Sequence, residues 1–261
     1  MKILFFGDIF GKQGQKAIMS FLPDYKIQNN IDICIANCEN LTEGKGVSES
    51  DIKEMQKAGI DIFSSGNHLY DRIEGMQFIE KEDKIAKPLN YPKEAPGNSF
   101  IKYKKKEITT LLITLCGQSF MHPVDSPFFV FEDFLSNFPD LPKVIIVDFH
   151  AESTAEKKTF GYYFDGKITA MIGTHTHIQT ADEEILENGT GYITDVGMCG
   201  SHNSIIGIKK EIAFKRLITG IPLRHITANE GVQINAVVID VDENTGRTTG
   251  IFRIKEKIYT T

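Results

Sequence analysis

Two histidines separated by one residue directly follow an apolar run in the segment "MIGTHTHIQTAD", residues 171–182. Imidazole nitrogens bind zinc, iron, copper, cobalt and nickel, so His175 and His177 are candidate metal ligands. In an extended segment, residues i and i+2 point to the same side, which predicts that both rings face one point. The alternative is a polar sheet edge without a metal, and the pair alone does not decide between the two.

Other residues with donor atoms also stand directly after strand-like runs. Asp8 follows the run 2–7, Glu39 and Asn40 follow 31–37, Asn67 and His68 follow 60–64, His150 follows 143–149, and the histidine pair follows 167–173. Each residue alone has an ordinary explanation as a turn former, a helix N-cap or a hydrogen-bonded histidine. Because ligand sites form where the carboxyl ends of strands meet, the whole set predicts one site at that edge.

The donor types indicate which kind of site this is. Three histidines with carboxylates and amides, and no thiolate, are too many for one tetrahedral zinc. They fit two metal ions about 3.5–4 Å apart, bridged by a carboxylate and a water, as in enzymes acting on phosphate esters or peptides. A metallopeptidase is disfavoured because the chain has no H-E-x-x-H helix. The segment "GDIFGKQG", residues 7–14, lacks the P-loop spacing, which excludes that nucleotide loop.

Strand-like runs alternate with helical patterns in the first half of the chain, which predicts a parallel sheet covered by helices. The helical patterns occupy 14–22, 49–58, 71–82 and 209–219, and further strand-like runs occupy 107–115, 190–194, 235–241 and 248–255. Residues 98–116 and the last 30 residues are more typical of antiparallel pairs. We therefore expect an α/β fold with two sheets, in a single domain over 1–261.

Composition excludes several classes of protein. A formal net charge of −6 argues against a long nucleic-acid partner, and the basic cluster 102–107 is interpreted as a solvated hairpin tip. No apolar run approaches the roughly 20 residues that span a bilayer, and no signal peptide is evident, so a cytoplasmic location is expected. The four cysteines form no C-x-x-C pair and are expected to be reduced and buried.

The spacing of these motifs resembles a known family. "GD" (7–8), "NCEN" (37–40), "GNH" (66–68), "DFHAE" (148–152) and "GTHTH" (173–177) are similar to calcineurin-like metallophosphoesterases, and specifically to their YmdB-like bacterial branch. The wider superfamily has Asp-x-His at the first motif and Gly-Asp-x-x-Asp at the second. This chain departs from both, and the YmdB-like branch shares both departures. "TDVGM" (194–198) is also typical of that branch.

The resemblance implies a four-layer α-β-β-α sandwich with two mixed sheets and a centre of two metal ions, with iron expected and manganese or zinc as alternatives. It assigns Asp8, Glu39, Asn40 and His177 to one ion. It assigns Glu39, Asn67, His150 and His175 to the other ion, with Glu39 bridging the two. His68 resembles the proton donor of the family.

Members of the branch hydrolyse phosphodiesters, including 2′,3′-cyclic nucleotides and cyclic AMP. The resemblance therefore implies a small phosphodiester or cyclic nucleotide as substrate, attacked by a metal-bridging hydroxide while His68 protonates the leaving oxygen. No membrane partner is expected, and a homo-oligomer is left open. The alternative is a metal-bearing regulatory protein that binds a nucleotide with little turnover; His68 argues against it, since binding alone needs no proton donor.

Residues around the centre complete the prediction. Metal-bound imidazoles need a partner on their other nitrogen, and Asp148 and Asp195 are candidates, although both could simply cap loops. His202, on a glycine-flanked loop, is a candidate substrate contact. His122 and His225 are interpreted as structural or exposed residues.

Overall fold

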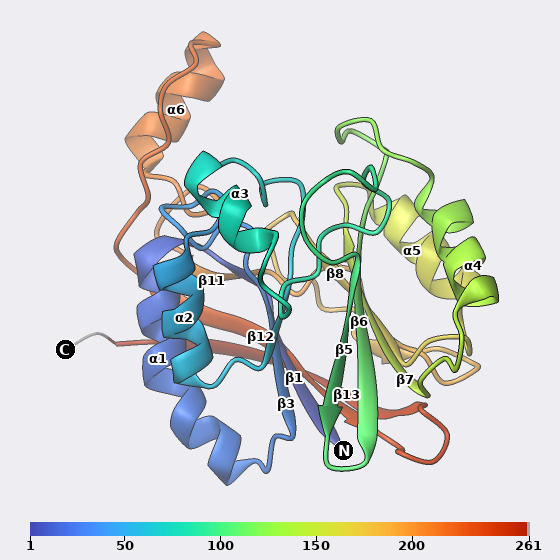
Figure 1. The fold of residues 1–261 in the computed structure, drawn as a ribbon. Coiled ribbons are helices and arrows are strands. Elements are labelled where there is room, and N and C mark those ends of the chain that lie inside the picture. Colours follow the sequence, from blue (N-terminus) through green and yellow to red (C-terminus); the bar gives the residue numbers. More distant parts are fainter. Residues whose placement is uncertain (260–261) are drawn as a thin grey trace.

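The structure, a computed structural model, describes residues 1–259; the last two residues of the domain predicted over 1–261 lie outside the described residues. Two β-sheets lie face to face, and helices cover the outer face of each sheet (Figure 1). Each sheet contains both parallel and antiparallel pairs. The predicted four-layer α-β-β-α sandwich with two mixed sheets is therefore confirmed.

The first sheet has the strand order β2-β11-β12-β1-β3-β4, with β13 also paired to β12. Its strands are β1 (Lys2–Phe6), β2 (Asp8–Ile9), β3 (Ile33–Asn37), β4 (Ile62–Ser64), β11 (Met198–Ser201), β12 (Val232–Val241) and β13 (Thr248–Lys257). β1, β3 and β4 are parallel, whereas β12 is antiparallel to β1 and β13. Helices α1 (Gly11–Gln28) and α2 (Glu49–Ala58) pack on the outer face through Ile18, Ile52 and Met55.

The second sheet has the strand order β5-β6-β7-β8-β10-β9. Its strands are β5 (Phe100–Lys105), β6 (Ile108–Cys116), β7 (Val144–His150), β8 (Ala170–Thr174), β9 (Glu184–Ile185) and β10 (Gly191–Ile193). The four inner strands are parallel, and β5 and β9 are antiparallel edges. Helices α4 (Pro127–Asn137) and α5 (Thr154–Tyr163) cover its outer face, where Phe149 and Phe160 stack with ring centroids 4.5 Å apart.

Strand β1 shows why strand-forming runs of the sequence can be apolar at every position. Ile3 and Phe5 belong to the core between the sheets, whereas Leu4 and Phe6 belong to the core under α1. Successive side chains of a strand point to opposite faces, so a strand covered on both faces needs an unbroken apolar run. Polar residues are therefore confined to the ends of such strands. The carboxyl ends of the parallel strands in the two sheets lie at one end of the sandwich, where the candidate site forms (Figure 1).

The predicted strands are confirmed within a few residues, but two helices were missed. Helix α1 continues past its predicted end at residue 22 because Pro23 is accommodated inside it, and α3 (Ile73–Ile79) is shorter than predicted. Helices α4 and α5 were not predicted. The side chain of Ser153 accepts from the backbone N of Glu156 at 3.3 Å, so a Ser-x-x-Glu capping signal was present before α5.

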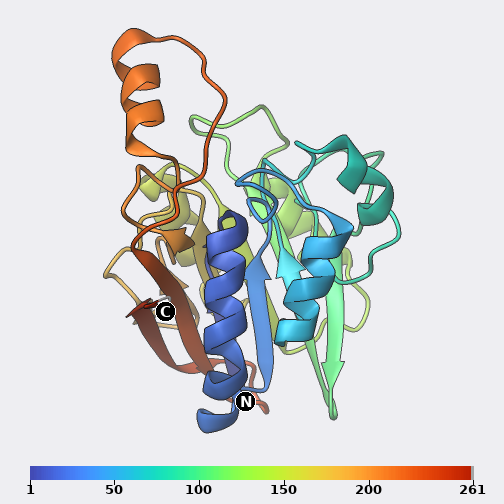
Figure 2. The same ribbon diagram turned by 90° about the vertical axis from the view of Figure 1, so that its left-hand side faces the viewer.

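An arm projects from the end of the sandwich that carries the candidate site (Figures 1 and 2). It consists of α6 (Lys210–Thr219) and the return segment that ends at Thr227. Backbone hydrogen bonds close its base, from Lys209 N to Ile226 O at 2.9 Å and from Ala228 N to Gly207 O at 2.9 Å. The arm is therefore attached to the body at a fixed point beside the site.

Three further expectations concern the cysteines, the basic cluster and the membrane. All four cysteines are buried and free, as predicted. Residues 102–107 span the β5–β6 hairpin turn, and Lys102, Lys104 and Lys106 are exposed there, which confirms the predicted solvated tip. Within residues 1–259, no helix combines the length and the apolarity needed to cross a membrane.

Candidate metal centre

Asp8 enters the site at a close approach between two chain segments. It begins β2, directly after β1, and it is fully buried. A Cβ atom at the preceding residue, Gly7, would lie 1.8 Å from the carbonyl oxygen of Gly197, so only glycine fits there. The Asp8 carboxylate accepts a hydrogen bond from the backbone N of His175 at 3.3 Å. The tight packing of Gly7 thus aims Asp8 across to the second sheet.

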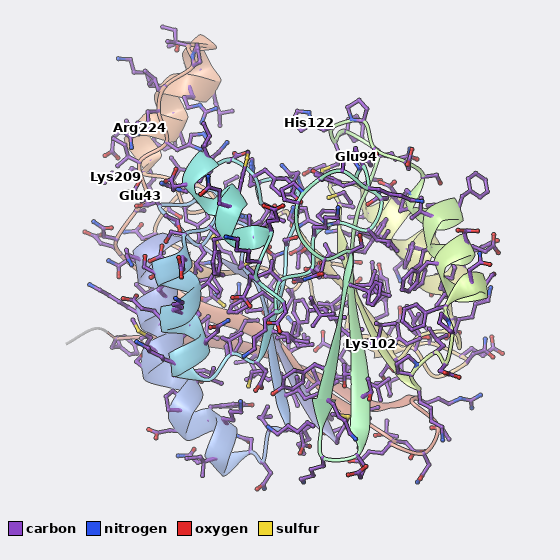
Figure 3. All side chains as sticks on the ribbon, in the orientation of Figure 1. Glu43, Glu94, Lys102, His122, Lys209 and Arg224 are labelled. Atoms are coloured by element: carbon purple, nitrogen blue, oxygen red, sulfur yellow. The ribbon has the colours of Figure 1, made fainter. Side chains whose placement is uncertain are left out.

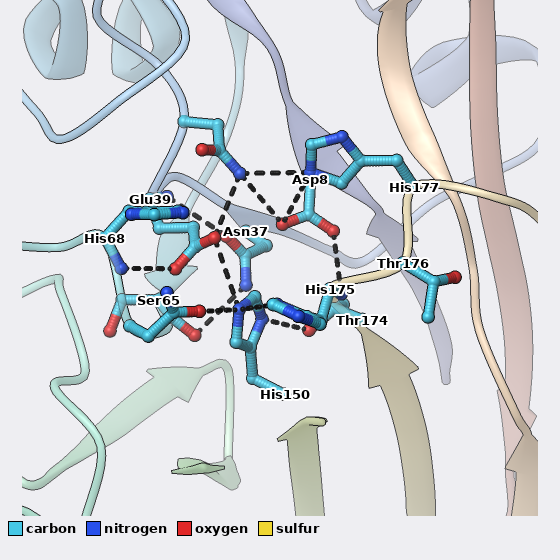
Figure 4. Close-up of polar contacts among 12 residues, drawn as sticks. Asp8, Asn37, Glu39, Ser65, His68, His150, Thr174, His175, Thr176 and His177 are labelled. Carbon is cyan, nitrogen blue, oxygen red and sulfur yellow. Dashed lines mark hydrogen bonds and ion pairs between the residues drawn. The ribbon is translucent and has the colours of Figure 1, made fainter. Parts of the chain in front are cut away.

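Glu39 is held in place by residues of three different strand ends. The side-chain oxygen of Asn37, the last residue of β3, accepts from the backbone N of Glu39 at 3.0 Å. The Asn37 amide nitrogen donates to Asp148 of β7 at 3.0 Å, which ties the two sheets together. The backbone N of His68 donates to Glu39 Oε2 at 2.8 Å. Oε1 of Glu39 faces His150 and Asn40 (Figure 4).

His150, the last residue of β7, is fully buried and is oriented by a hydrogen-bond relay. The Thr174 hydroxyl donates to Asp148 at 2.6 Å, so it accepts from His150 Nδ1 at 2.8 Å. This relay leaves Nε2 of His150 facing Glu39 Oε1 at 3.2 Å and Asn67 Oδ1 at 2.9 Å. Asp148 therefore orients an imidazole through the hydroxyl of Thr174, a residue without a predicted role.

His175 and His177 do not lie in an extended segment, so the predicted reason for their convergence is wrong. Strand β8 ends at Thr174, and the two histidines follow with φ values of 102° and 65°. Such left-handed backbone is costly for non-glycine residues and persists where surrounding contacts hold it. The chain turns sharply here, and both rings nevertheless reach the centre (Figure 4).

Each of these two rings has a partner on its outer nitrogen. His175 Nε2 lies 3.2 Å from the carboxylate of Glu152, while its Nδ1 faces His150 Nε2 at 3.1 Å. His177 Nδ1 donates to the carbonyl oxygen of Ile206 at 3.0 Å, which turns its Nε2 inward. Partners of this kind fix the tautomer and orientation of a metal-binding imidazole.

The inward donor atoms form two groups that share Glu39. One carboxylate oxygen of Glu39 and one ring nitrogen each of His150 and His175 lie within 4.8 Å of one another. In the second group, the Asn40 amide nitrogen lies 3.0 Å from Glu39 Oε1, 3.2 Å from His177 Nε2 and 3.4 Å from Asp8 Oδ1.

This arrangement fits metal ions better than hydrogen bonds. One amide group carries two hydrogens, so it cannot satisfy the three acceptors that surround the Asn40 nitrogen. Turning that amide over would direct its oxygen inward and leave Asp8, Glu39, Asn40 and His177 as a set of oxygen and nitrogen donors. Such donors suit iron, manganese and zinc. The donor chemistry of both groups therefore fits metal cations, and Glu39 belongs to both groups.

Burial and neighbouring charges shift the pKa values of the groups in the centre. Burial raises the pKa of Asp8 well above its usual value. Burial opposes protonation of His150, but the carboxylate of Glu39 outweighs it and raises the pKa of His150 to about 9. Burial and the neighbouring charge of His150 lower the pKa of His175 to about 3. The buried carboxylates are thus arranged to hold positive charge between them.

His68 lies at the rim of the centre and is oriented from outside. Its Nδ1 donates to the Asp71 carboxylate at 2.9 Å, which leaves Nε2 free. Lys45 lies 3.3 Å from the same carboxylate. A pocket of about 260 Å³ opens over the centre, lined in part by Glu39, His68, His177, Lys45 and His225.

Asp71 and Lys45 had no predicted role. Asp71 stands three residues after His68, and this spacing was the available signal. His225 is predicted to be structural or exposed, but it lines this pocket, and it belongs to none of the motifs that indicated the site.

Two predicted residues are placed away from the inward donors. Asp195 is fully buried, pairs with Lys157 at 2.7 Å and accepts from both N and Oγ1 of Thr176. It thus holds the loop between the two histidines but contacts no imidazole. His202 Nε2 lies 3.1 Å from the Met198 carbonyl oxygen, and His202 lines a different pocket.

Comparison with known proteins places this site in a family. Residues 4–254 match the family model described as YmdB-like protein. The chain is 38% identical over 256 residues to a 2′,3′-cyclic-nucleotide 2′-phosphodiesterase of Bacillus subtilis, covering 97% of this chain and 96% of that protein. A crystal structure of a phosphatase from Mycoplasma pneumoniae has a TM-score of 0.94 at 31% identity, covering 98% of this chain and 93% of that one. A hypothetical protein of Thermus thermophilus has a TM-score of 0.93 at 34% identity, covering 98% and 99%. The chain therefore belongs to the YmdB-like family.

Proposed function

We propose that the chain hydrolyses small phosphodiesters at a two-metal centre, with 2′,3′-cyclic nucleotides as its main substrates and 3′,5′-cyclic AMP as a further one. The observation that carries this proposal is the pair of donor groups that share Glu39 Oε1. The similarity to a 2′,3′-cyclic-nucleotide 2′-phosphodiesterase supports the substrate class. We also propose that both sheets act as one domain, since they share the apolar core between them.

The geometry of the two donor groups supports the ligand assignment that the resemblance implies. Asp8, Asn40 and His177 would hold one ion, Asn67, His150 and His175 the other, and Glu39 both. Iron is the proposed metal, with manganese or zinc as alternatives, because every donor is nitrogen or oxygen. When bound, two such ions neutralise the phosphoryl oxygens and lower the pKa of a water.

The residues of the chain supply orientation and a proton. A water that has already lost one proton forms a bond through its oxygen to phosphorus, the P–O2′ bond breaks, and O2′ leaves with the electron pair. His68 gives O2′ a proton, so that a nucleoside 3′-phosphate is released. Asp71 accepts from Nδ1 of His68 and thereby keeps Nε2 directed to this task.

The test compares His68→Ala with the unchanged protein after measuring the metal content of both. We expect the variant to keep its metal and to lose about 10²- to 10⁴-fold in kcat on adenosine 2′,3′-cyclic phosphate. A nitrophenyl phosphodiester provides the control, because nitrophenolate leaves without a proton and its hydrolysis should be much less affected. Equal losses on both substrates would contradict the proton-donor assignment.

A panel of 2′,3′-cyclic, 3′,5′-cyclic and linear diesters tests the substrate class. Tight nucleotide binding without turnover on any of them, in metal-loaded protein, would contradict hydrolysis and favour a regulatory protein. The same panel with His202→Ala tests the predicted contact of His202 with substrate. A changed KM would support that contact, and an unchanged KM would contradict it.

A further inference from the structure

A second pocket adjoins the candidate centre, and the proposed reaction does not use it. Its volume is about 670 Å³. Lys45 and His225 line both this pocket and the pocket over the centre, so the two share a wall. We call it the arm pocket, because Arg216 of α6 and Arg224 of the return segment line its outer side.

The arm pocket is positively charged in a chain that is acidic overall. Its charged lining residues are Lys45, Arg72, Arg216 and Arg224, with Glu43 as the acid, whereas the formal net charge of the whole chain is −6. With His225 neutral, the lining residues carry a net charge of +3, and the adjoining Asp71 and Glu74, which pair with Lys45 and Arg72, reduce the local excess to +1. Clustered basic side chains in one concave site favour an anionic ligand.

The cations of the arm pocket differ in how far they are already paired. Arg72 donates to Glu43 at 2.8 Å and to Glu74 at 3.0 Å, so it is committed to the protein. Arg224 lies 3.8 Å from Glu43, and its side chain is 90% exposed. Figure 3 labels both residues near the base of the arm. Arg216 makes no ion pair with any residue of 1–259. The guanidinium groups of the arm are therefore available to a ligand.

The pKa of His225 is also affected by the positive charge of the arm pocket. Burial, followed by the charges of Arg216 and Lys45, lowers its pKa to about 4. The ring is therefore neutral near pH 7 and offers both a donor and an acceptor between the two pockets. Lys45 on the same shared wall also contacts the Asp71 carboxylate that orients His68.

We propose that the arm pocket binds a second phosphate of the substrate, so that the preferred substrate is a nucleoside 2′,3′-cyclic phosphate that also carries a 5′-phosphate. This inference rests on the proposed function. The cyclic phosphate and the 5′-phosphate lie at opposite ends of one ribose, so such a nucleotide needs two adjoining anion sites. Guanidinium groups suit the second site because they bind phosphate oxygens in a bidentate manner.

The kinetic test uses metal-loaded protein with adenosine 2′,3′-cyclic phosphate and its 5′-phosphorylated form. We expect kcat/KM to be about tenfold higher for the 5′-phosphorylated compound, mainly through a lower KM. Arg216→Gln and Arg224→Gln should each reduce this preference. The matched control is Lys215→Gln, which removes the same charge from the adjacent residue of α6, outside the pocket lining, and should leave the preference intact.

A binding measurement separates this inference from the proposed reaction. Calorimetry compares the dissociation constants of adenosine 3′,5′-bisphosphate and adenosine 3′-monophosphate, and we expect the bisphosphate to bind about tenfold tighter in a manner that depends on Arg216. Two results would contradict phosphate binding in the arm pocket without affecting the proposed reaction. One is hydrolysis of both cyclic compounds with equal kcat/KM, and the other is a preference for the 5′-phosphorylated compound that is unchanged in both arginine variants. Absence of hydrolysis with the bisphosphate preference intact would support the arm pocket and contradict the proposed reaction.

Discussion

The buried ion pair between Lys157 and Asp195 provides the sharpest test of how the histidine loop is held. Both side chains are fully buried, and their charged atoms lie 2.7 Å apart. Lys157 also donates to the Thr174 carbonyl oxygen at 2.8 Å, and Asp195 accepts from Thr176 on the other side of His175. The pair therefore fixes the backbone on both sides of a candidate ligand.

Replacing Lys157 with methionine keeps a long apolar side chain but leaves Asp195 as an unpaired buried charge. Removing one partner of such a pair costs about 3–5 kcal/mol. The entropy of unfolding is about 2.1 cal/mol/K per residue, so 261 residues give about 0.5 kcal/mol/K. The expected loss in Tm is then about 5–9 °C.

The assay is thermal unfolding of Lys157→Met, Asp195→Asn and the double variant, each with measured metal content. The double variant should recover most of the loss of Lys157→Met, because it has no unpaired charge. Both single variants should bind metal more weakly, since the loop that carries His175 loses an anchor. A Tm of Lys157→Met within 2 °C of the unchanged protein would refute the argument that this burial makes the pairing necessary.

Three further predictions concern the centre and its rim. Glu152→Gln removes the carboxylate beside His175 Nε2, and we expect about a 10- to 100-fold loss in metal affinity, measured by competition with a chelator. Gly66→Ala places a Cβ atom 2.4 Å from both Glu39 Oε2 and His150 Nε2, so metal content should fall sharply while far-ultraviolet circular dichroism stays unchanged. His225, with its pKa lowered to about 4, should titrate by NMR well below an ordinary histidine. It contributes fully to stability above about pH 6.5, where neither state is charged, and loses that contribution as the pH falls toward 4, because the unfolded chain binds the proton first.

The chemical class of the centre was predictable because it depends on residue types and on strand ends. Strands that are buried on both faces are recognisable in the sequence as unbroken apolar runs. Polar donors such as Asp8, Glu39 and His150 could therefore stand only at the ends of these strands. Parallel strands then bring those termini to one edge. Helix α4 was missed for the converse reason, because its position depends on aromatic packing against the second sheet, which local periodicity does not record. Helix α5 packs against the same sheet, but its Ser153-x-x-Glu156 cap was a local signal in the sequence.

Only the tertiary structure decided how each donor is aimed and what surrounds the centre. The left-handed backbone at His175 and His177, the Thr174 relay to Asp148 and the contact of Glu152 with His175 all depend on segments distant in the chain or on a local bend. The same holds for the arm pocket, which Lys45 and Arg216 both line although 170 residues separate them in the chain. Sequence patterns specify which side chains are buried or exposed, because that depends on local periodicity. The direction of a side chain depends on contacts that form only when the two sheets pack together.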